Sequence, residues 1–513
     1  MFFLTLVIAD AQGQVEIYNK RFSLGYNNLV FRSIEITDTC FFISGIGADS
    51  TSGSFFARFD FSGVPNYFKL NKGDNQSLMT WGRDFQQFSQ DQWIVSGEGA
   101  DNTGAYVIIV ILNSQGDTLQ IARIYHPNHP EEQFIVAAAG IEKFENQWFV
   151  LMNIHDPSTS TTPSNDLFLA KMSQNLDIEW TKHYKYPKNE YGKCAVQVGQ
   201  NFLLGAWRTN FNTNNKNFTT QLYFVRIDTL NGDITKTFLY PYTPTNQLLM
   251  GPADDMLVED DGSLIVATRI GKEEPINQNQ SYIRWTSAVL KVNANLSEVL
   301  WVQTMFSGNT SDATQFFKIV GAPDQSGYVA VGVATYEPGI FGGALAKVSP
   351  EGDSLWLRHY KYVSSPLAIH YLYDLEATPD GGYVMVGEAR AGIADTLFPP
   401  PVQQGWILKV DEWGCLVPGC QLDVATKDAP AGEGMRLKVY PNPASEVLYI
   451  HLPDAGPQGR FRLIDALGHT LREFAASPGD TTYILPLEGI PPGWYVVWYE
   501  EGERRLTASV YRF

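Results

Sequence analysis

The strongest constraint on the fold is a short pattern that recurs along most of the chain. An aromatic residue follows a polar turn and is itself followed by small or apolar residues and a glycine, as in DQWIVSGEGAD (91–101), QSGYVAVGVAT (325–335) and DGGYVMVGEAR (380–390). The seven copies begin at Phe41, Trp93, Trp148, Phe202, Leu264, Tyr328 and Tyr383. Spacings of 52 to 64 residues with strand-like alternation are typical of four-stranded propeller blades. The repeat therefore predicts a seven-bladed β-propeller.

The last two copies show how the strands should follow one another. In the sixth we expect strands at about 313–322, 327–334, 342–349 and 354–362. In the seventh we expect strands at about 366–377, 382–388 and 405–410, and a cysteine-containing turn then takes the place of a fourth strand. Residues 14–23, QVEIYNKRFS, alternate like an outer strand. We expect this N-terminal strand to complete the last blade and to close a ring spanning residues 12–420.

Composition supports an all-β fold and narrows the possible partners. Aromatic residues make up 13% of the chain, which also holds 44 glycines and 28 prolines, and such residues favour short strands and tight turns. The net charge of -18 argues against nucleic acids and anionic membrane surfaces as partners. Beyond the N-terminus no apolar stretch is long enough to span a bilayer. We expect a monomer without a membrane span.

The first residues resemble an export signal. The apolar run Phe2–Ala9 is followed by Ala9-Asp10-Ala11, which fits the small residues that precede a signal-peptidase site. No Lys or Arg precedes the run, so either the native start lies upstream or the segment is a hydrophobic first strand. We interpret residues 1–11 as a signal peptide, possibly truncated, with a mature chain that begins near Gln12.

The four cysteines divide into a close pair and two isolated residues. Cys415 and Cys420 are five residues apart around a Pro-Gly turn, which predicts a disulfide. A zinc site would need two further ligands nearby and is the weaker alternative. Cys40 and Cys194 lie in apolar alternating runs and are expected to be buried free thiols.

A second domain follows a polar linker at 421–436 that is rich in Ala, Gly and Pro. Residues 437–513 contain seven short alternating segments separated by turns, which predicts a small immunoglobulin-like β-sandwich.

This domain also resembles a known family. VYPNPASEVLYI (439–450), IDALGHTL (464–471) and LEGIPPGWYVVWYE (487–500) are similar to the type A C-terminal sorting domain of the type IX secretion system of Bacteroidetes. The family's signature residues fall on Pro441, Asn442, Pro443, Gly468, Gly493, Trp494 and Tyr495. A Lys or Arg usually precedes the last strand of the family, and here Arg504 and Arg505 stand slightly early. The resemblance implies interaction with the secretion machinery and delivery to the cell surface, as an outer-membrane-attached protein, or to the medium.

Candidate ligand-binding residues follow the second strand of each blade, at the rim where the longest connections are expected. These connections are 153–165, 208–219, 270–283 and 389–404. The candidates are His155, Trp207, Arg208, Arg269, Tyr336, Glu388 and Arg390. Trp and Arg side chains can stack on and hydrogen-bond a sugar or a peptide. The alternative is that all seven are ordinary rim residues.

No nucleophile elbow, zinc-protease motif, phosphate loop or dinucleotide fingerprint occurs, so the sequence gives no catalytic residue, metal or cofactor. His126 and His129 stand on a proline-bent segment without defined ligand spacing. The sequence therefore favours a secreted, non-catalytic binding module for extracellular polysaccharide or protein. A hydrolase or lyase with its acids on the rim, and a structural surface component, remain alternatives.

Overall fold

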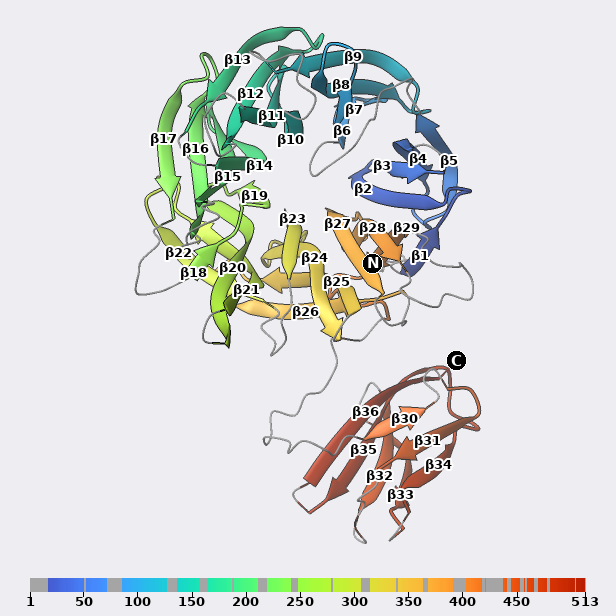
Figure 1. Cartoon of the computed structure of the whole chain (residues 1–513). Coiled ribbons are helices and arrows are strands. Elements are labelled where there is room, and N and C mark those ends of the chain that lie inside the picture. Colours follow the sequence, from blue (N-terminus) through green and yellow to red (C-terminus); the bar gives the residue numbers. More distant parts are fainter. Residues whose placement is uncertain are drawn as a thin grey trace, which may run out of the picture. The chain divides into compact units, whose positions relative to one another are not determined.

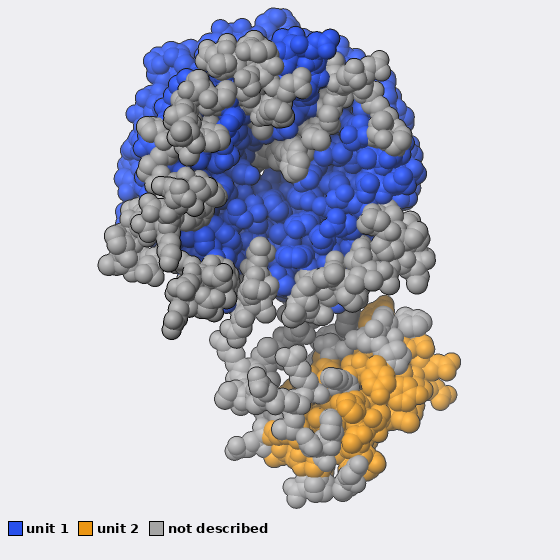
Figure 2. All heavy atoms as spheres, viewed as in Figure 1, with its two compact units in different colours: residues 1–416 blue, residues 417–513 orange. Residues whose placement is uncertain are grey.

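The computed structural model describes residues 17–49, 52–71, 85–126, 136–156, 164–186, 189–210, 219–240, 248–277, 280–305, 314–337, 340–362, 368–390, 403–417, 420, 437–440, 444–452, 456, 459–465, 469–477, 480–502 and 504–512. The chain divides into two compact units, residues 1–416 and 417–513, which Figure 2 colours separately. Apart from a 3₁₀ turn at Cys420, every regular element among the described residues of both units is a β-strand, so the predicted all-β class is confirmed.

The first unit is a succession of small antiparallel sheets arranged around a ring, a propeller-like architecture (Figure 1). Three four-stranded sheets follow one another along the chain. The first contains β6 (Phe85–Ser89), β7 (Gln92–Ala100), β8 (Ala105–Asn113) and β9 (Thr118–Tyr125), and the second contains β10 (Val136–Phe144), β11 (Gln147–Asp156), β12 (Ser164–Ser173) and β13 (Ile178–Tyr184). The third contains β14 (Asn189–Val198), β15 (Asn201–Asn210), β16 (Thr219–Asp228) and β17 (Ile234–Leu239). The next sheet contains β18 (Leu248–Met250), β19 (Asp255–Val258), β20 (Leu264–Asn277), β21 (Gln280–Val292) and β22 (Val299–Thr304).

The two ends of the ring share one twelve-stranded sheet. Its members are β1 (Tyr18–Phe22), β2 (Asn28–Ile36), β3 (Phe41–Ala48), β4 (Ser52–Phe59), β5 (Pro65–Asn71), β23 (Gln315–Gly321), β24 (Tyr328–Glu337), β25 (Ile340–Val348), β26 (Ser354–Tyr360), β27 (Ile369–Ala377), β28 (Tyr383–Arg390) and β29 (Gln403–Val410). β1 pairs antiparallel with β29, from Tyr18 opposite Lys409 to Phe22 opposite Gly405. An N-terminal strand thus lies beside the last strand of the ring.

Several expected rim loops are shorter than the sequence pattern indicates. The predicted connection 270–283 is instead the end of the long β20–β21 hairpin, in which Lys272 pairs with Arg284 and Glu273 with Ile283. β11, β15 and β28 likewise extend past the apolar residues that predicted them. Polar side chains at the tip of a hairpin can continue the backbone ladder because ladder bonds do not depend on side-chain polarity.

The repeat anchors form the interior. All seven anchor residues are buried, and Trp93, Trp148 and Tyr383 are among the largest fully buried side chains. Their clusters combine residues from neighbouring sheets; one contains Trp148 of β11 together with Ile94 of β7 and Val107 of β8. The hydrophobic core therefore lies between successive sheets. The apolar surface that the sheets bury against one another stabilises the ring.

A β-bulge interrupts the pairing between the innermost strand and its neighbour within five of the described strand pairs, and a sixth shift, at Phe88, lies at the end of the β6–β7 pair. The bulged residues are Arg32, Ala139, Lys193, Phe317 and Tyr373. The repeat glycine lies opposite three of these bulges, where a Cβ atom on Gly45, Gly332 or Gly387 would come within 2.0, 1.9 or 1.8 Å of an inner-strand carbonyl oxygen. The glycine of the sequence pattern is therefore required by the close approach of the bulged strand.

The second unit has two small sheets around one core. β30 (Lys438–Tyr440), β31 (Val447–His451) and β34 (Thr482–Pro486) form one, and β33 (Thr470–Ala475), β32 (Arg460–Asp465), β35 (Gly493–Glu501) and β36 (Arg504–Arg512) form the other. Leu448 and Ile450 of the first sheet share a buried cluster with Phe461, Leu463 and Val497 of the second. Arg504 and Arg505 lie inside β36 rather than before it, because both pair with β35.

The cysteine predictions are confirmed. Cys415 and Cys420 are disulfide-bonded, and Cys40 and Cys194 are buried free thiols. Asp411 holds the turn before the disulfide, because its Oδ1 accepts hydrogen bonds from the backbone N–H groups of Trp413 and Cys415.

Candidate functional site

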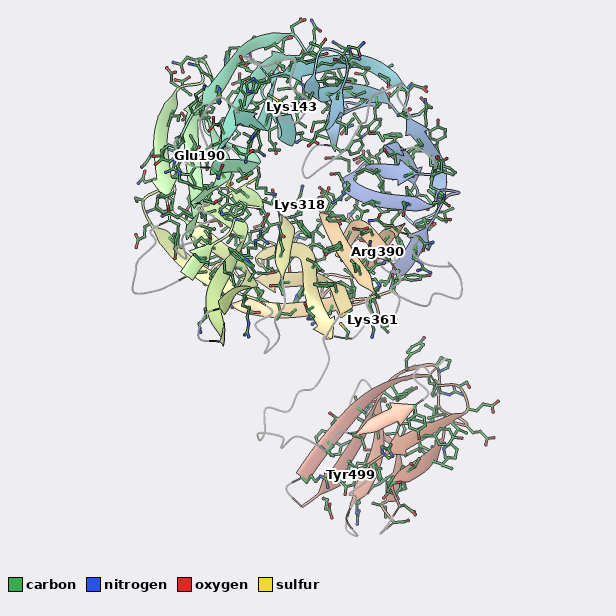
Figure 3. The ribbon with its side chains drawn as sticks, in the orientation of Figure 1. Lys143, Glu190, Lys318, Lys361, Arg390 and Tyr499 are labelled. Carbon is green, nitrogen blue, oxygen red and sulfur yellow. The ribbon has the colours of Figure 1, made fainter. Side chains whose placement is uncertain are left out.

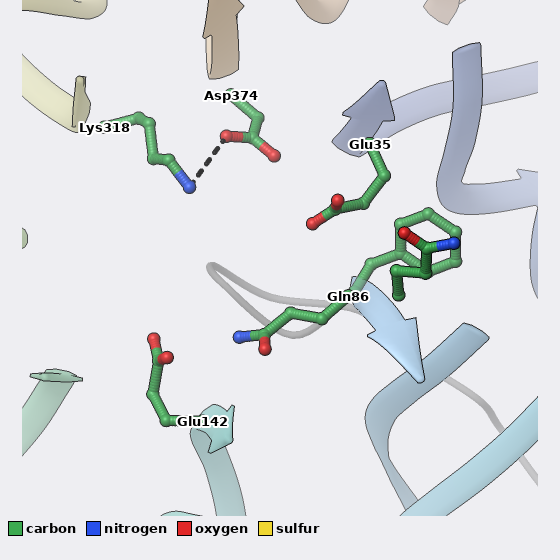
Figure 4. Close-up of a pocket in the computed structure, with 7 residues that line it drawn as sticks. Glu35, Gln86, Glu142, Lys318 and Asp374 are labelled. Atoms are coloured by element: carbon green, nitrogen blue, oxygen red, sulfur yellow. Dashed lines mark ion pairs between the residues drawn. The ribbon is translucent and has the colours of Figure 1, made fainter. Parts of the chain in front are cut away.

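The inner strands of the ring enclose a polar cavity of about 340 Å³, which is within the size range of small-ligand sites. Five strands contribute to its wall: β2, β6, β10, β23 and β27. The lining residues are Glu35, Phe85, Gln86, Gln87, Glu142, Lys318 and Asp374. Figure 4 shows Glu35, Gln86, Glu142 and Lys318 extending into the same space from separate strands.

Asp374 is the most firmly held member of this wall. Its Oδ2 accepts a 2.9 Å hydrogen bond from the backbone N–H of Ile34 on β2, and its Oδ1 accepts one from Leu375. The Lys318 ammonium lies 3.4 Å from Oδ1 (Figure 4). Asp374 thus links three inner strands and fixes the position of the cavity's lysine.

The two glutamines are held through their amide nitrogens. Gln86 Nε2 donates to the carbonyl of Ile141 on β10 at 2.6 Å, and Gln87 Nε2 donates to the carbonyl of Gln90 at 3.2 Å. Each amide nitrogen therefore donates one hydrogen bond to the backbone, and each amide oxygen can still accept one.

An aromatic residue directly precedes each member of the Lys318–Asp374 pair in the sequence. Phe317 and Tyr373, the bulged residues that directly precede Lys318 and Asp374, lie 5.3 Å apart between ring centroids. Tyr371 stacks on Tyr373 at 5.7 Å, and the Arg32 guanidinium lies 4.0 Å from the Tyr373 centroid. Three bulged residues, Arg32, Phe317 and Tyr373, thus contact one another in a cluster that is aromatic and cationic.

The seven residues predicted from the sequence lie within strands rather than in loops that follow them. His155 is in β11, Trp207 and Arg208 in β15, Arg269 in β20, Tyr336 in β24, and Glu388 and Arg390 in β28. The structure distributes them over five hairpins, and the Tyr336 side chain lies outside the described atoms. His155 is half-buried, and Arg390 is exposed at the end of its strand.

Arg208 is buried in a structural ion pair. Its Nη2 and Nε lie 2.5 and 3.0 Å from Glu190 Oε1, and its guanidinium lies 3.6 and 4.0 Å from the ring centroids of Tyr186 and Tyr223. Burial raises the pKa of Glu190, against the opposing effect of Arg208. Figure 3 labels Glu190 within its sheet and Lys318 on the inner side of the ring. The ring centroid of the adjacent Trp207 lies 5.5 Å from that of Tyr191.

Glu388 and Arg269 reach the inner strands. Glu388 is buried and accepts hydrogen bonds from the Tyr373 hydroxyl, at 2.5 Å, and from Gln403. Burial raises its pKa, while Tyr373, Arg32 and Arg390 oppose that shift. Arg269 lies over Trp285 at 4.8 Å and donates to Gln315.

Asp254 is a buried carboxyl group that contacts the inner strand β23. Its Oδ1 accepts a 2.9 Å hydrogen bond from Gln315, and its Oδ2 is shielded from solvent without a hydrogen-bond partner among the described atoms. Burial raises the pKa of Asp254 to about 6, although Lys193 and Arg269 favour its charged form.

No described trio of His, Cys, Asp or Glu side chains is close enough to hold a metal ion. His126 is buried near His183, which pairs with Asp166 at 2.9 Å, and His129 lies outside the described residues.

Of the family-signature residues, Tyr495 is buried and donates to the carbonyl of Pro491 at 2.6 Å. Gly493 and the backbone of Trp494 begin β35, whereas Pro441, Asn442, Pro443 and Gly468 lie outside the described residues.

The cavity residues were missed because the sequence prediction looked for sites only at strand ends. Glu35 and Lys318 each stand between two apolar residues within a strand, and Glu142 directly follows Ile141. Charged residues inside otherwise apolar strands are uncommon in a core. That signal could have identified the inner wall.

Comparison with known families identifies the C-terminal unit. Residues 438–511 match the family described as "Secretion system C-terminal sorting domain". This match indicates export through the type IX secretion system, and hence a secreted or cell-surface location. Within the described residues, no helix is both long and apolar enough to cross a bilayer.

No curated protein matches the chain. Similar solved structures include Drosophila Semaphorin 2a, at 9% identity over 97% of each chain with a TM-score of 0.46. The plexin A4 extracellular region is 10% identical over 97% of this chain and 62% of that chain, with a TM-score of 0.44. A Synechocystis apocarotenoid oxygenase mutant is 10% identical over 66% of this chain and 73% of that chain, with a TM-score of 0.39.

Proposed function

We propose that this chain is an extracellular binding protein of Bacteroidetes: a seven-bladed β-propeller passenger, residues 12–420, delivered by a type A sorting domain of immunoglobulin-like form at 437–513. The signal peptide at 1–11 and the linker at 421–436 complete this organisation. After export, the passenger is attached to the outer membrane or released as a monomer, and it binds extracellular polysaccharide or protein.

The inner-strand cavity carries the binding proposal. Its wall combines carboxylate, ammonium and amide groups held by backbone contacts from several strands, as Asp374 and Gln86 illustrate. A preformed polar cavity of this kind orients a ligand at small entropic cost. The rim residues first considered for this role are weaker candidates, since Arg208 and Glu388 already have buried partners.

A sedimentation assay tests the proposal. The full chain is mixed with insoluble polysaccharides and with extracellular protein extracts, and the pellet and the soluble fraction are analysed by mass spectrometry. We expect the chain in one pellet without new soluble fragments. New oligosaccharides or peptides would instead establish a hydrolase or lyase, and absence from every pellet would overturn binding.

Two variants locate the site, and one deletion tests export. Glu142→Gln, in the cavity wall, should reduce the fraction of the protein that sediments with its ligand, whereas Arg390→Ala, at the exposed end of β28, should not.

Fractionation of cells that express residues 1–513 or 1–436 should show the longer chain outside the cell and the shorter one inside it. Equal export of both would contradict the sorting role.

A further inference from the structure

We infer that the C-terminal unit contacts the secretion machinery through the outer face of the sheet formed by β30, β31 and β34, with Tyr440, Tyr449 and Ile484 at the centre of the contact. The inference rests on the proposed sorting role of this unit and names the surface that performs it.

The alternation of side chains along the strands places these three residues on the solvent side of the sheet. Leu448 and Ile450 flank Tyr449 in β31 and are buried in the core, so the Tyr449 side chain points away from the core. Backbone pairing sets Tyr440 opposite Tyr449, and Tyr449 opposite Ile484. The three strands are neighbours in one sheet (Figure 1). The three side chains therefore form one row across its outer face.

This row is apolar and open to solvent. Tyr440, Tyr449 and Ile484 are 49%, 38% and 62% exposed, and the two tyrosine rings stack with centroids 5.5 Å apart. Val447 and Pro486, paired with each other on the same face, extend the apolar surface. Within the described part of the chain, no group forms a hydrogen bond with either tyrosine hydroxyl. Both tyrosines are therefore available to a partner, and tyrosine is a common residue in protein interfaces.

The outer face of the other sheet is charged instead. Arg462 Nη2 lies 2.7 Å from Glu500 Oε1, and Arg460 Nη1 lies 3.2 Å from Glu473 Oε1. Paired charges of this kind are typical of a sheet that faces water. A contiguous apolar row on an exposed face is typical of an interaction site. Within one small unit, the β30–β31–β34 face is thus the one suited to a protein partner.

The family of the unit identifies that partner. Residues 438–511, which include all three strands, match the secretion system sorting family, so we assign the face to a protein component of that system. The size of the face favours a transient contact. Its strands have three, five and five residues, which gives an area of about 14 Å by 17 Å, or about 240 Å². A stable dimer buries about 800 Å² per subunit, so this face suits a partner that binds the chain and then releases it.

Export of single-residue variants of the full chain, measured by fractionation of cells that have a type IX secretion system, tests the inference. Tyr440→Lys, Tyr449→Lys and Ile484→Lys should each lower the exported fraction about fivefold or more, because each buries an unpaired ammonium group in the contact. Tyr449→Phe keeps the aromatic ring and should be exported like the wild type. The control Thr470→Lys adds the same charge at an exposed position of the other sheet and should also be exported normally.

Photo-crosslinking identifies what covers the face. p-Benzoylphenylalanine replaces Tyr449 or, as a control, Thr470 in the full chain of secreting cells, and mass spectrometry identifies the crosslinked products. We expect a component of the secretion system to be crosslinked from Tyr449 and not from Thr470. Crosslinks from Tyr449 only to a second copy of this chain, or only to the chain's own first unit, would overturn the inference.

Normal export of all three lysine variants would also overturn it. So would a lowered melting temperature in every variant that is not exported, because the loss of export would then reflect a folding defect. If residues 1–436 stay inside the cell while the lysine variants are exported, the surface is wrong and the sorting role stands. If residues 1–436 are exported as well, both proposals fail.

Discussion

Asn19 and Trp406 are joined by a 2.6 Å hydrogen bond from the indole Nε1 to the Asn19 Oδ1, although 387 residues separate them in the chain. Trp406 is fully buried on β29, and Asn19 is the second residue of β1. The Asn19 amide nitrogen also donates to the carbonyl of Lys361. One side chain near the N-terminus therefore ties together strands from the far end of the ring.

Asn19→Ala should lower the free energy of unfolding by about 1–3 kcal/mol, because it leaves a buried indole N–H without an acceptor. Urea denaturation followed by tryptophan fluorescence measures the loss. Asn102→Ala, at an exposed turn, is the matched control and should change stability by less than about 0.5 kcal/mol. Similar effects from both substitutions would contradict a specific closing role for Asn19.

Gly387→Ala should destabilise the ring by about 2–4 kcal/mol, since its Cβ would lie 1.8 Å from the carbonyl oxygen of Tyr371 and the bulged strand would have to move. Gly321→Ala is the control, because a Cβ there meets no atom within 4 Å. Thermal melting compares the two. A melting temperature unchanged by Gly387→Ala would show that the bulge does not require glycine.

Arg208→Ala should cost about 3–5 kcal/mol of stability, because Glu190 would remain as an unpaired buried carboxylate. The paired change Arg208→Met with Glu190→Leu should recover much of this loss. Arg390→Ala, another predicted rim residue but an exposed one, should have little effect. If Arg208→Ala left the denaturation midpoint unchanged and abolished ligand binding, the residue would belong to a binding site after all.

Asp254 and His370 should make the free energy of unfolding change with pH in opposite directions. Burial raises the pKa of Asp254 from 3.8 to about 6, so between these values the folded state binds more protons and stability falls as pH rises. Burial lowers the pKa of His370 from 6.5 to about 4, so there the unfolded state binds more protons and stability rises with pH. Each effect amounts to at most about 3 kcal/mol across its window.

Asp254→Asn and His370→Gln separate these two effects. From pH 4 to pH 6, the stability of Asp254→Asn relative to the wild type should increase, whereas that of His370→Gln should decrease. Urea titrations at half-unit pH intervals measure both differences. Parallel curves for either variant and the wild type would show that the substituted group does not titrate in this range.

The sequence predicted the elements that depend on periodic side chains. The aromatic anchors identified the strands and the buried interior because residues such as Trp93 and Tyr383 recur at blade-length intervals. Spacing around a turn was enough to predict the Cys415–Cys420 disulfide. These features are local or repetitive, so one chain displays them directly.

The candidate site could not be predicted in the same way. Arg208 was expected at an exposed rim, but Tyr186 and Tyr223, which precede and follow it in the chain, cover its guanidinium. The cavity assembles side chains such as Glu35 and Lys318 from strands nearly 300 residues apart. Only the folded ring brings such positions together. The repeat pattern does not predict them, because these charged residues do not recur from one repeat to the next.

The bulges give the inner wall a freedom that the rest of each sheet lacks. A bulged residue stands outside the regular pairing, and this position already holds arginine, alanine, lysine, phenylalanine and tyrosine around one ring. The glycines opposite three of the bulges, Gly45, Gly332 and Gly387, accommodate the close approach of the bulged strand. Of the five bulged side chains, Ala139 packs in the core and Tyr373 is hydrogen-bonded to Glu388, whereas those of Arg32, Lys193 and Phe317 are at least partly exposed. A combinatorial library over these last three positions should therefore yield folded proteins with altered selectivity, which makes the ring a scaffold whose recognition surface can be reprogrammed separately from its framework.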